Sequence, residues 1–270
     1  MEVSIIIVNW NTKDLVVDCV KSIVDSTKNI SFEIIVVDNG SEDGSVGALR
    51  RLKRTIGQLI VIENKSNDGF AKANNMGIKK AKGKYILLLN SDTEVTGGGI
   101  EKMVKFAEQT PDVGVVGARL LNRDGSLQES VFNLPTLTRV VRQYWFGQKG
   151  LLDKLSPKGR QPVEVEAVVG AAFLITPKAR DKVGRLSERY FMYFEDLDYC
   201  RRVRRAGLKV YYLPSAEVFH YHGASGRKIT NGGDQWRRLI PSSKAYHGIV
   251  QHYLIWFVMW TGQKFGKLVK

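Results

Sequence analysis

The first 120 residues alternate short apolar runs with stretches of helical periodicity, and this rhythm limits what the chain can fold into. The apolar runs are rich in Ile and Val and almost continuous, as in strands that are buried on both faces. Strand and helix in this order predict an α/β domain with a mostly parallel sheet that is flanked by helices. The expected strands are 3–10, 32–39, 59–64, 84–90 and 113–121, and the expected helices are about 13–26, 44–54, 70–81 and 98–109.

The second half of the chain is less regular. Residues 133–162 hold three prolines and indicate a loop-rich connection with a short helix near 139–146. An acidic start, a basic end and Gly207 predict a helix within 190–207. The remaining expected elements are a buried segment at 163–177, strands at 209–214 and 216–222, and a helical tail from about 235.

The net charge of +14 favours an anionic partner such as nucleic acid, a phosphorylated ligand or an acidic membrane surface. Residues 221–270 hold eight Lys or Arg and one acid, so half of the excess lies in the last fifty residues. Two cysteines form no disulfide framework or metal cluster and fit a cytoplasmic protein with reduced thiols. The amino terminus lacks the basic start of a signal peptide, and no run of about 18 apolar residues is present.

Polar segments follow four of the expected strands, where ligands of a parallel sheet bind. Asp92 ends the buried run "YILLLNSD", and a carboxylate there is costly unless it is paired or binds metal. Beside a nucleoside diphosphate it would suit Mg²⁺ or Mn²⁺, and the alternative is a turn or helix cap. Asp38, in "IIVVDNGS", can accept a hydrogen bond from a nucleobase imide or can serve as a turn acid.

The segment "NDGFAKANNMGI" (67–78) predicts a turn at Asp68-Gly69 and a helix start near Phe70. Free N–H groups at such a start favour phosphate or another anion. Asn74 and Asn75 are either polar contacts of the site or residues of the helix surface.

Two further clusters can carry chemistry. Three acids lie at the expected helix start in "FEDLDYCRR" (194–202), and one of them can act as a general base. For Asp198 the preferred interpretation is structural, an i,i+4 pair with Arg202. His220 and His222 alternate along a strand, share one face, and are usable ligands for a divalent metal.

These motifs, in this order over residues 3–226, resemble an inverting family 2 glycosyltransferase of the GT-A fold. The resemblance rests on "SIIIVNWN", "IIVVDNGSEDGS", "NDGFAKANNMGI", "YILLLNSDTEV", "VVGAAFLI", "YFMYFEDLDYCRR" and "HYHGAS". It is closest to the rhamnosyltransferase-like branch, which acts on cell-envelope polysaccharides. The resemblance implies a catalytic domain at 1–226, with a nucleotide-binding half (1–120) and an acceptor half (121–226), and a basic, aromatic helical tail at 227–270.

The resemblance also implies roles for single residues. Asp196 matches the catalytic base, with Glu195 as the fallback. "NSD" matches the family's DxD metal motif with Asn in its first position, Asp92 is the metal acid, and His220 or His222 is a further ligand of metal or phosphate. The implied nucleotide-sugar site comprises Val8, Asn9, Asn11, Asp38, Asn67, Asp68, Gly69, Asn74, Asn90, Ser91, Asp92, Gly170 and Ala171.

The implied reaction is a metal-assisted hexosyl transfer with inversion. Mg²⁺ or Mn²⁺ neutralises the diphosphate leaving group of a dTDP or UDP sugar, and Asp196 accepts the proton of the attacking hydroxyl. The resemblance suggests L-rhamnose from dTDP-rhamnose as the sugar and a glycan or lipid-linked molecule of the cell envelope as the acceptor.

The apolar and aromatic residues 249–260 are followed by Lys264, Lys267 and Lys270. This pattern suits a helix that lies on an anionic membrane face, which would make the protein peripheral on the inner side of the plasma membrane. The alternative is a helix that packs on the catalytic domain or in a homodimer interface.

Other classes fit the sequence less well. A nucleotidyltransferase should carry a Gly-rich basic loop after the first strand, and a dinucleotide dehydrogenase needs GxGxxG there, but the chain has "NWNTKD". A nucleic-acid-binding protein would explain the charge, but no reader motif is present and the acids at the strand ends would repel phosphates in the absence of metal. Nucleic acid is therefore not expected as a partner.

Overall fold

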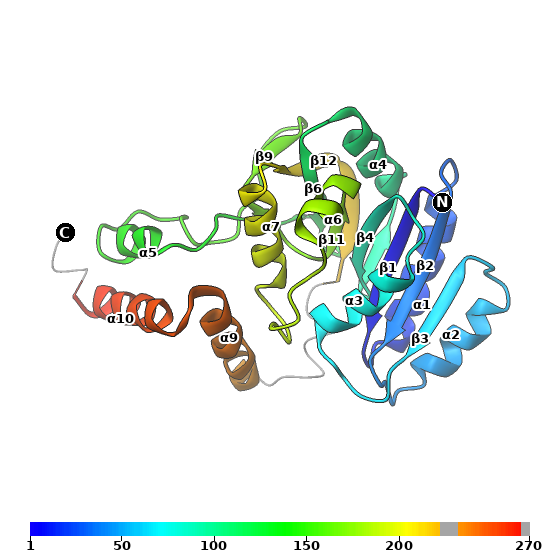
Figure 1. Cartoon of the computed structure of the whole chain (residues 1–270), viewed down its shortest axis with the longest axis horizontal. Helices are drawn as coiled ribbons and strands as arrows, with labels where there is room; N and C mark the ends of the chain where they lie inside the picture. The colour runs from blue at the N-terminus through cyan, green and yellow to red at the C-terminus, as the bar shows by residue number, and fades with distance from the viewer. Residues whose placement is uncertain (222–231, 266–270) are drawn as a thin grey trace.

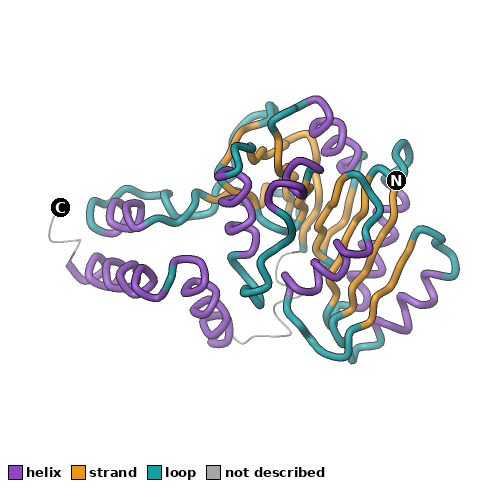
Figure 2. The backbone as a smooth tube through the Cα atoms, viewed as in Figure 1, coloured by secondary structure: helices purple, strands orange, loops and turns teal. Residues whose placement is uncertain are grey.

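The computed structural model describes residues 1–221 and 232–265. Its centre is a ten-stranded mixed sheet with helices on both faces (Figures 1 and 2). The first four strands pair in parallel in the order β3-β2-β1-β4. These strands are β1 (Val3–Asn9), β2 (Phe32–Asp38), β3 (Leu59–Glu63) and β4 (Tyr85–Asn90).

The first four helices lie where the sequence predicts them, each after one of these strands. They are α1 (Lys13–Ser26), α2 (Ser45–Lys53), α3 (Phe70–Lys80) and α4 (Gly99–Gln109). Alternate strand residues face opposite sides of the sheet, so the buried side chains form two clusters. Helices α1, α2 and α4 cover one cluster. The other is covered by α3, α6 (Pro177–Val183) and α7 (Glu195–Arg205). The expected α/β layers are confirmed.

The second half departs from purely parallel pairing. Strand β11 (Ala172–Ile175) runs antiparallel between β4 and β6 (Val113–Leu121), and β12 (Lys209–His220) runs parallel to β6. The alternation of strand and helix stops after β6, so the sequence offers no crossover signal there. The smaller strands are β5 (Thr93–Val95), β7 (Leu127–Gln128), β8 (Val131–Phe132), β9 (Val163–Val165) and β10 (Ala167–Val168).

Strand β12 replaces two expected strands. The sequence predicts a break at Pro214, because proline cannot donate to a sheet ladder. The chain instead shifts its register against β6 between Leu213 and Glu217 and then continues to His220. A bulge of this kind lets one strand absorb the proline. His220 thereby lies at the sheet edge where β4 ends.

Three helices form an arm beside the sheet (Figure 1). They are α5 (Leu137–Tyr144), α9 (Gly232–His247) and α10 (Ile249–Phe265). Helix α10 packs closely on α5, since a Cβ added to Gly262 would lie 2.7 Å from Tyr144 Cβ. Within the described ranges, no helix has the length and apolar character needed to cross a membrane.

Candidate active site

The end of β4 and the end of β12 bring three of the expected metal-site residues together. His220 Nε2 lies 3.4 Å from Asp92 Oδ1 and 3.3 Å from Asn90 Nδ2. The Tyr221 N–H donates to the Asp92 carbonyl at 2.8 Å, which fixes one strand end against the other. Asp92 is 2% and His220 5% exposed, so their interaction is little screened by water.

Gln128 on β7 determines which nitrogen of His220 carries the proton. The Gln128 side-chain amide donates to Asn122 Oδ1 at 2.8 Å and to the His220 carbonyl at 3.3 Å. Its Oε1 therefore faces His220 Nδ1, 2.6 Å away, and must accept a hydrogen bond from it. The network places a proton on Nδ1, and Nε2 faces Asp92 and the Asn90 amide.

This donor set fits a hard divalent cation. The His220 imidazole and an Asp92 carboxylate oxygen lie side by side, with the Asn90 amide next to them. Across residues 1–221 and 232–265, no group of three or more His, Cys, Asp or Glu side chains could hold a metal ion. Phosphate oxygens or water would therefore complete the coordination. His222 lies outside the described residues.

A buried hydrogen-bond network joins the ends of β2, β1 and β4. Asn9 Nδ2 donates to Asp38 Oδ2 at 2.7 Å, and Thr12 Oγ1 donates to Asn9 Oδ1 at 2.7 Å. The Thr12 and Ser91 hydroxyls then lie 3.0 Å apart. Asp38 also accepts the Ser41 N–H and is wholly buried. A nucleobase imide would have to replace one of these bonds, so its contact with Asp38 stays a prediction.

The start of α3 contacts the segment that precedes α7. The Phe70 N–H donates to the Phe191 carbonyl at 2.7 Å, and the Gly69 N–H donates to Asn67 Oδ1 at 3.0 Å. The expectation of free N–H groups is therefore wrong for Phe70, the first residue of this helix. Gly69 has φ +86°, and a Cβ there would lie 2.6 Å from the Phe191 oxygen. Only glycine allows this contact without strain.

Gly170 and Ala171 lie between the metal-site residues and the catalytic acids. The Asn90 N–H donates to the Ala171 carbonyl at 3.0 Å, and the Gly170 N–H donates to Asp196 Oδ2 at 3.1 Å. Asp196 Oδ1 accepts the Leu197 N–H at 2.8 Å. Hydrogen bonds through two small residues thus connect the end of β4 to Asp196, the carboxylate that the resemblance implies as the base.

Glu195 and Asp196 differ in how the protein supports their negative charge. Burial raises the pKa of both carboxyls, and the neighbouring Asp196 raises the pKa of Glu195 further. The Leu197 and Gly170 N–H groups oppose this rise for the pKa of Asp196. Glu195 Oε2 is buried with no hydrogen-bond partner among the described residues. A proton is therefore held more readily by Glu195, and the charge by Asp196.

The structural interpretation of Asp198 is confirmed. Its carboxylate lies 2.8 Å from Arg202 Nε, and Arg189 and Arg201 approach it at 2.8 Å and 2.9 Å. Tyr190 donates its hydroxyl at 3.2 Å. Although burial would raise the pKa of Asp198, the arginines lower it below its ordinary value. Asp198 therefore anchors α7 rather than facing a substrate.

Other expected site residues have partners within the chain. Asn74 donates to the Phe70 carbonyl of its own helix at 2.9 Å, and Asp68 pairs with Lys72 at 3.1 Å. Asn11 accepts the Glu42 N–H at 2.8 Å, and its φ of +54° places it in the left-handed region. Val8 is half-buried and packs on the cluster beneath α3. Ligand contacts by these four residues stay predictions.

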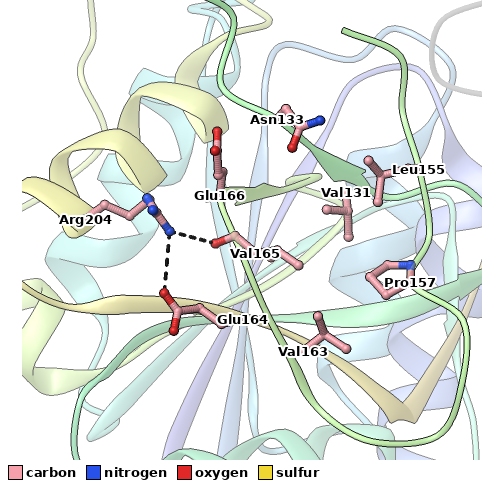
Figure 3. A pocket seen from close by; sticks show the side chains of 9 residues that line it. All are labelled: Val131, Asn133, Leu155, Pro157, Val163, Glu164, Val165, Glu166 and Arg204. Atoms are coloured by element: carbon pink, nitrogen blue, oxygen red, sulfur yellow. Dashed lines mark hydrogen bonds and ion pairs between the residues drawn. The ribbon is translucent and has the colours of Figure 1, made fainter. Parts of the chain in front are cut away.

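A separate hollow of about 360 Å³ lies beside β8 and β9 (Figure 3). Arg204 points into it, 3.8 Å from Glu164 Oε1 and 3.2 Å from the Val165 carbonyl (Figure 3). Glu166 at its rim pairs with Arg139 at 2.6 Å. The two glutamates of the hollow, Glu164 and Glu166, are thus each paired with an arginine.

Sequence reasoning did not single out Thr12, Ser41 or Gln128. Thr12 and Ser41 stand in the polar segments "NWNT" and "DNGSEDGS", so their position after strands was a usable signal. Gln128 had none, because it reaches His220 across 92 residues of chain.

Comparisons with known proteins identify the family of the chain. The model of the family "Glycosyl transferase family 2" matches residues 4–156. The N-acetylglucosaminyl-diphospho-decaprenol L-rhamnosyltransferase of Mycobacterium tuberculosis is 28% identical over 71% of this chain and 67% of that protein. Protein y4gI of Sinorhizobium fredii is 32% identical over 83% of this chain, which spans only 25% of its length.

The fold has solved counterparts as well. The crystal structure of GalNAc-T7 with UDP, GalNAc and Mn²⁺ has a TM-score of 0.63, with 18% identity over 81% of this chain and 43% of that one. At this identity the likeness shows the fold, which is the GT-A arrangement of a mixed sheet between helices. The family match spans more than half of the chain and ends beyond the strand ends at Asp38 and Asp92. The chain therefore belongs to glycosyl transferase family 2 and is a glycosyltransferase.

Proposed function

We propose that this enzyme transfers a sugar from a nucleoside diphosphate to an acceptor hydroxyl with inversion at the anomeric carbon. The observation that carries the proposal is the placement of Asp196 across Gly170 and Ala171 from the Asn90–Asp92–His220 cluster. One sheet edge thereby offers ligands for a diphosphate-bound cation and a carboxylate base. The GalNAc-T7 structure, which holds UDP and Mn²⁺, supports a nucleotide donor and a divalent cation.

Asp92 and His220 would hold Mg²⁺ or Mn²⁺ on the donor side, with Asn90 beside them. When bound, the cation would supply positive charge to the diphosphate leaving group. Gln128 holds the His220 ring through Nδ1, so Nε2 is the nitrogen that would face the cation. The network of Asp38, Asn9 and Ser91 keeps the loop ends of the nucleotide side in place.

Asp196 is the general base of the proposed reaction. The acceptor oxygen forms a bond to the anomeric carbon while its proton passes to Asp196, and the bond to the diphosphate breaks with its electron pair on that leaving group. The Gly170 and Leu197 N–H groups favour the charged form of Asp196, against the effect of burial. Glu195, buried and protonated, contributes no second negative charge.

The sugar we propose is L-rhamnose carried on dTDP, with a UDP sugar as the alternative donor. The Mycobacterium tuberculosis relative is named as a rhamnosyltransferase with a polyprenyl diphosphate-linked acceptor, which supports both rhamnose and an acceptor of this kind. The acceptor class proposed for this chain is accordingly a glycan or a lipid-linked molecule of the cell envelope. The division into a catalytic part at 1–226 and a tail at 227–270 belongs to the same proposal.

Thermal unfolding with nucleotides tests the donor site. UDP or dTDP with Mn²⁺ should raise the melting temperature, and oligonucleotides should not. Asp92→Asn should lose the part of the shift that depends on Mn²⁺, whereas Asp124→Asn, on an exposed turn, should keep it. A hydrolysis screen over a panel of sugar nucleotides then identifies the sugar. Stabilisation by oligonucleotides alone would contradict the proposal.

A further inference from the structure

Helix α10 turns its apolar side outward. Its buried residues are Ile255, Thr261 and Gly262, of which two are small or polar. An ordinary surface helix buries its large apolar side chains and exposes its polar ones. In α10 the exposed large side chains are Ile249, Val250, Tyr253, Leu254, Trp256, Phe257, Trp260 and Phe265, which we call the aromatic face.

Aromatic and basic side chains are paired along this face. The rings of Trp256 and Trp260 stack with centroids 6.3 Å apart and an interplanar angle of 9°. Lys264 Nζ lies 4.5 Å from the Trp260 ring centroid, and Lys244 Nζ lies 4.8 Å from that of Tyr253. Tryptophan and tyrosine beside lysine stems suit the boundary between lipid headgroups and acyl chains.

The charge of the arm identifies the partner. Residues 235–270 contain six Lys or Arg and no acid. The connection at 133–162, which carries α5 against α10, holds six more basic residues and only one acid, Asp153. A second copy of this chain would bring the same positive charge to the contact and be repelled. An anionic lipid surface would neutralise it.

We propose that the aromatic face of α10 docks on an anionic phospholipid bilayer. The proposal goes beyond the transfer reaction, because its supporting observations hold whichever sugar is moved. The docked arm also contacts the catalytic segment, since α9 donates from Ser242 Oγ to the Met192 carbonyl at 2.8 Å. A lipid-linked acceptor would thereby be presented beside Glu195 and Asp196, a consequence that does rest on the proposed function.

Flotation with vesicles tests the docking directly. The full chain should float with vesicles of phosphatidylcholine and phosphatidylglycerol, but not with phosphatidylcholine alone, and added salt should weaken binding. The double variant Trp256→Ser/Trp260→Ser should lower the bound fraction roughly fivefold or more. Lys244→Gln/Lys264→Gln should weaken binding to the anionic vesicles, although it leaves every apolar side chain of the aromatic face in place.

Two controls keep the result interpretable. Leu127→Ser removes an exposed apolar side chain on β7, away from the arm, and should leave flotation unchanged. Circular dichroism should show that each variant keeps its helix content, since the substituted side chains are exposed or half-buried. Equal flotation with both vesicle types, or none with either, would overturn the proposal. So would a concentration-dependent dimer that Trp256→Ser/Trp260→Ser abolishes while vesicles fail to bind.

Discussion

Gln128 Oε1 lies 2.6 Å from Nδ1 of His220 and accepts a hydrogen bond from it. The contact turns Nε2 toward Asp92, so a residue outside the expected motifs orients the histidine that we propose as a metal ligand. Such partners of ligating histidines orient the ring and set its tautomer.

Gln128→Leu should weaken Mn²⁺ binding by about 10- to 100-fold, because the tautomer of His220 is no longer fixed. Electron paramagnetic resonance of free Mn²⁺ in the presence of UDP measures this affinity without turnover. Gln128→Glu keeps an acceptor at Nδ1 and should retain most of the affinity. Gln143→Leu, on α5, serves as the matched control, because Gln143 only accepts the Leu152 N–H. Unchanged Mn²⁺ affinity in Gln128→Leu would exclude the tautomer role.

Asp196→Asn should lower the turnover number by about 10²- to 10⁴-fold while UDP or dTDP binding stays the same. The single amide oxygen can keep one of the two backbone contacts, with the Gly170 or the Leu197 N–H. Isothermal titration for binding and a product assay for transfer separate the two effects. Glu195→Gln is the informative comparison, since replacing a neutral carboxyl by a neutral amide should retain most of the turnover. The assignment fails if Asp196→Asn turns over normally.

Glu195 should make the protein less stable as the pH rises. Burial and the neighbouring Asp196 raise the pKa of Glu195 from 4.5 to about 8. Between these values the folded state keeps a proton that the unfolded state has released, so the free energy of unfolding falls with increasing pH. Glu195→Gln removes this slope and should be the more stable protein near pH 8, by on the order of 2–4 kcal/mol. Urea unfolding across this pH range measures the difference, and parallel curves for both proteins would contradict the expectation.

Asp198→Asn should destabilise the fold by about 2–4 kcal/mol, because it leaves Arg189, Arg201 and Arg202 without their shared buried carboxylate. The lowered pKa of Asp198 means that this stability is present above the unfolded pKa and is lost as the pH falls through the folded value. Urea unfolding tests both statements. Glu217→Gln, which removes a half-exposed partner of Arg119 at 3.7 Å, should cost under about 1 kcal/mol. Similar losses in both variants would argue against the anchor.

The nucleotide half of the fold could be predicted because its signals are local. Residues 13–26 form α1 as expected, and Asp38 and Asp92 end or follow their strands as expected. Each of these elements is specified by an apolar period and a polar boundary within about ten residues. The parallel direction of these strands could be predicted from the alternation of strand and helix.

The remainder depends on contacts between distant residues. Strand β11 inserts antiparallel beside β4 and pairs Ala172 with Leu89, and no local sequence pattern predicts this pairing. The helix start at Phe70 carried a correct turn signal, but the carbonyl that occupies its N–H comes from Phe191, 121 residues later. The resemblance implied Asp92 and His220 as metal ligands, and only the fold shows that the two side chains lie together.

Tyr193 and Phe194, directly before α7, both have φ of +69°, which is costly for non-glycine residues. The Phe194 ring packs on Tyr246 of α9 with centroids 5.3 Å apart, and Arg201 lies over that same tyrosine. Helix α9 thus packs against the turn that precedes α7 and Asp196. A shortened protein that stops at His220 would lack this packing, so we expect it to hold the strained turn less firmly.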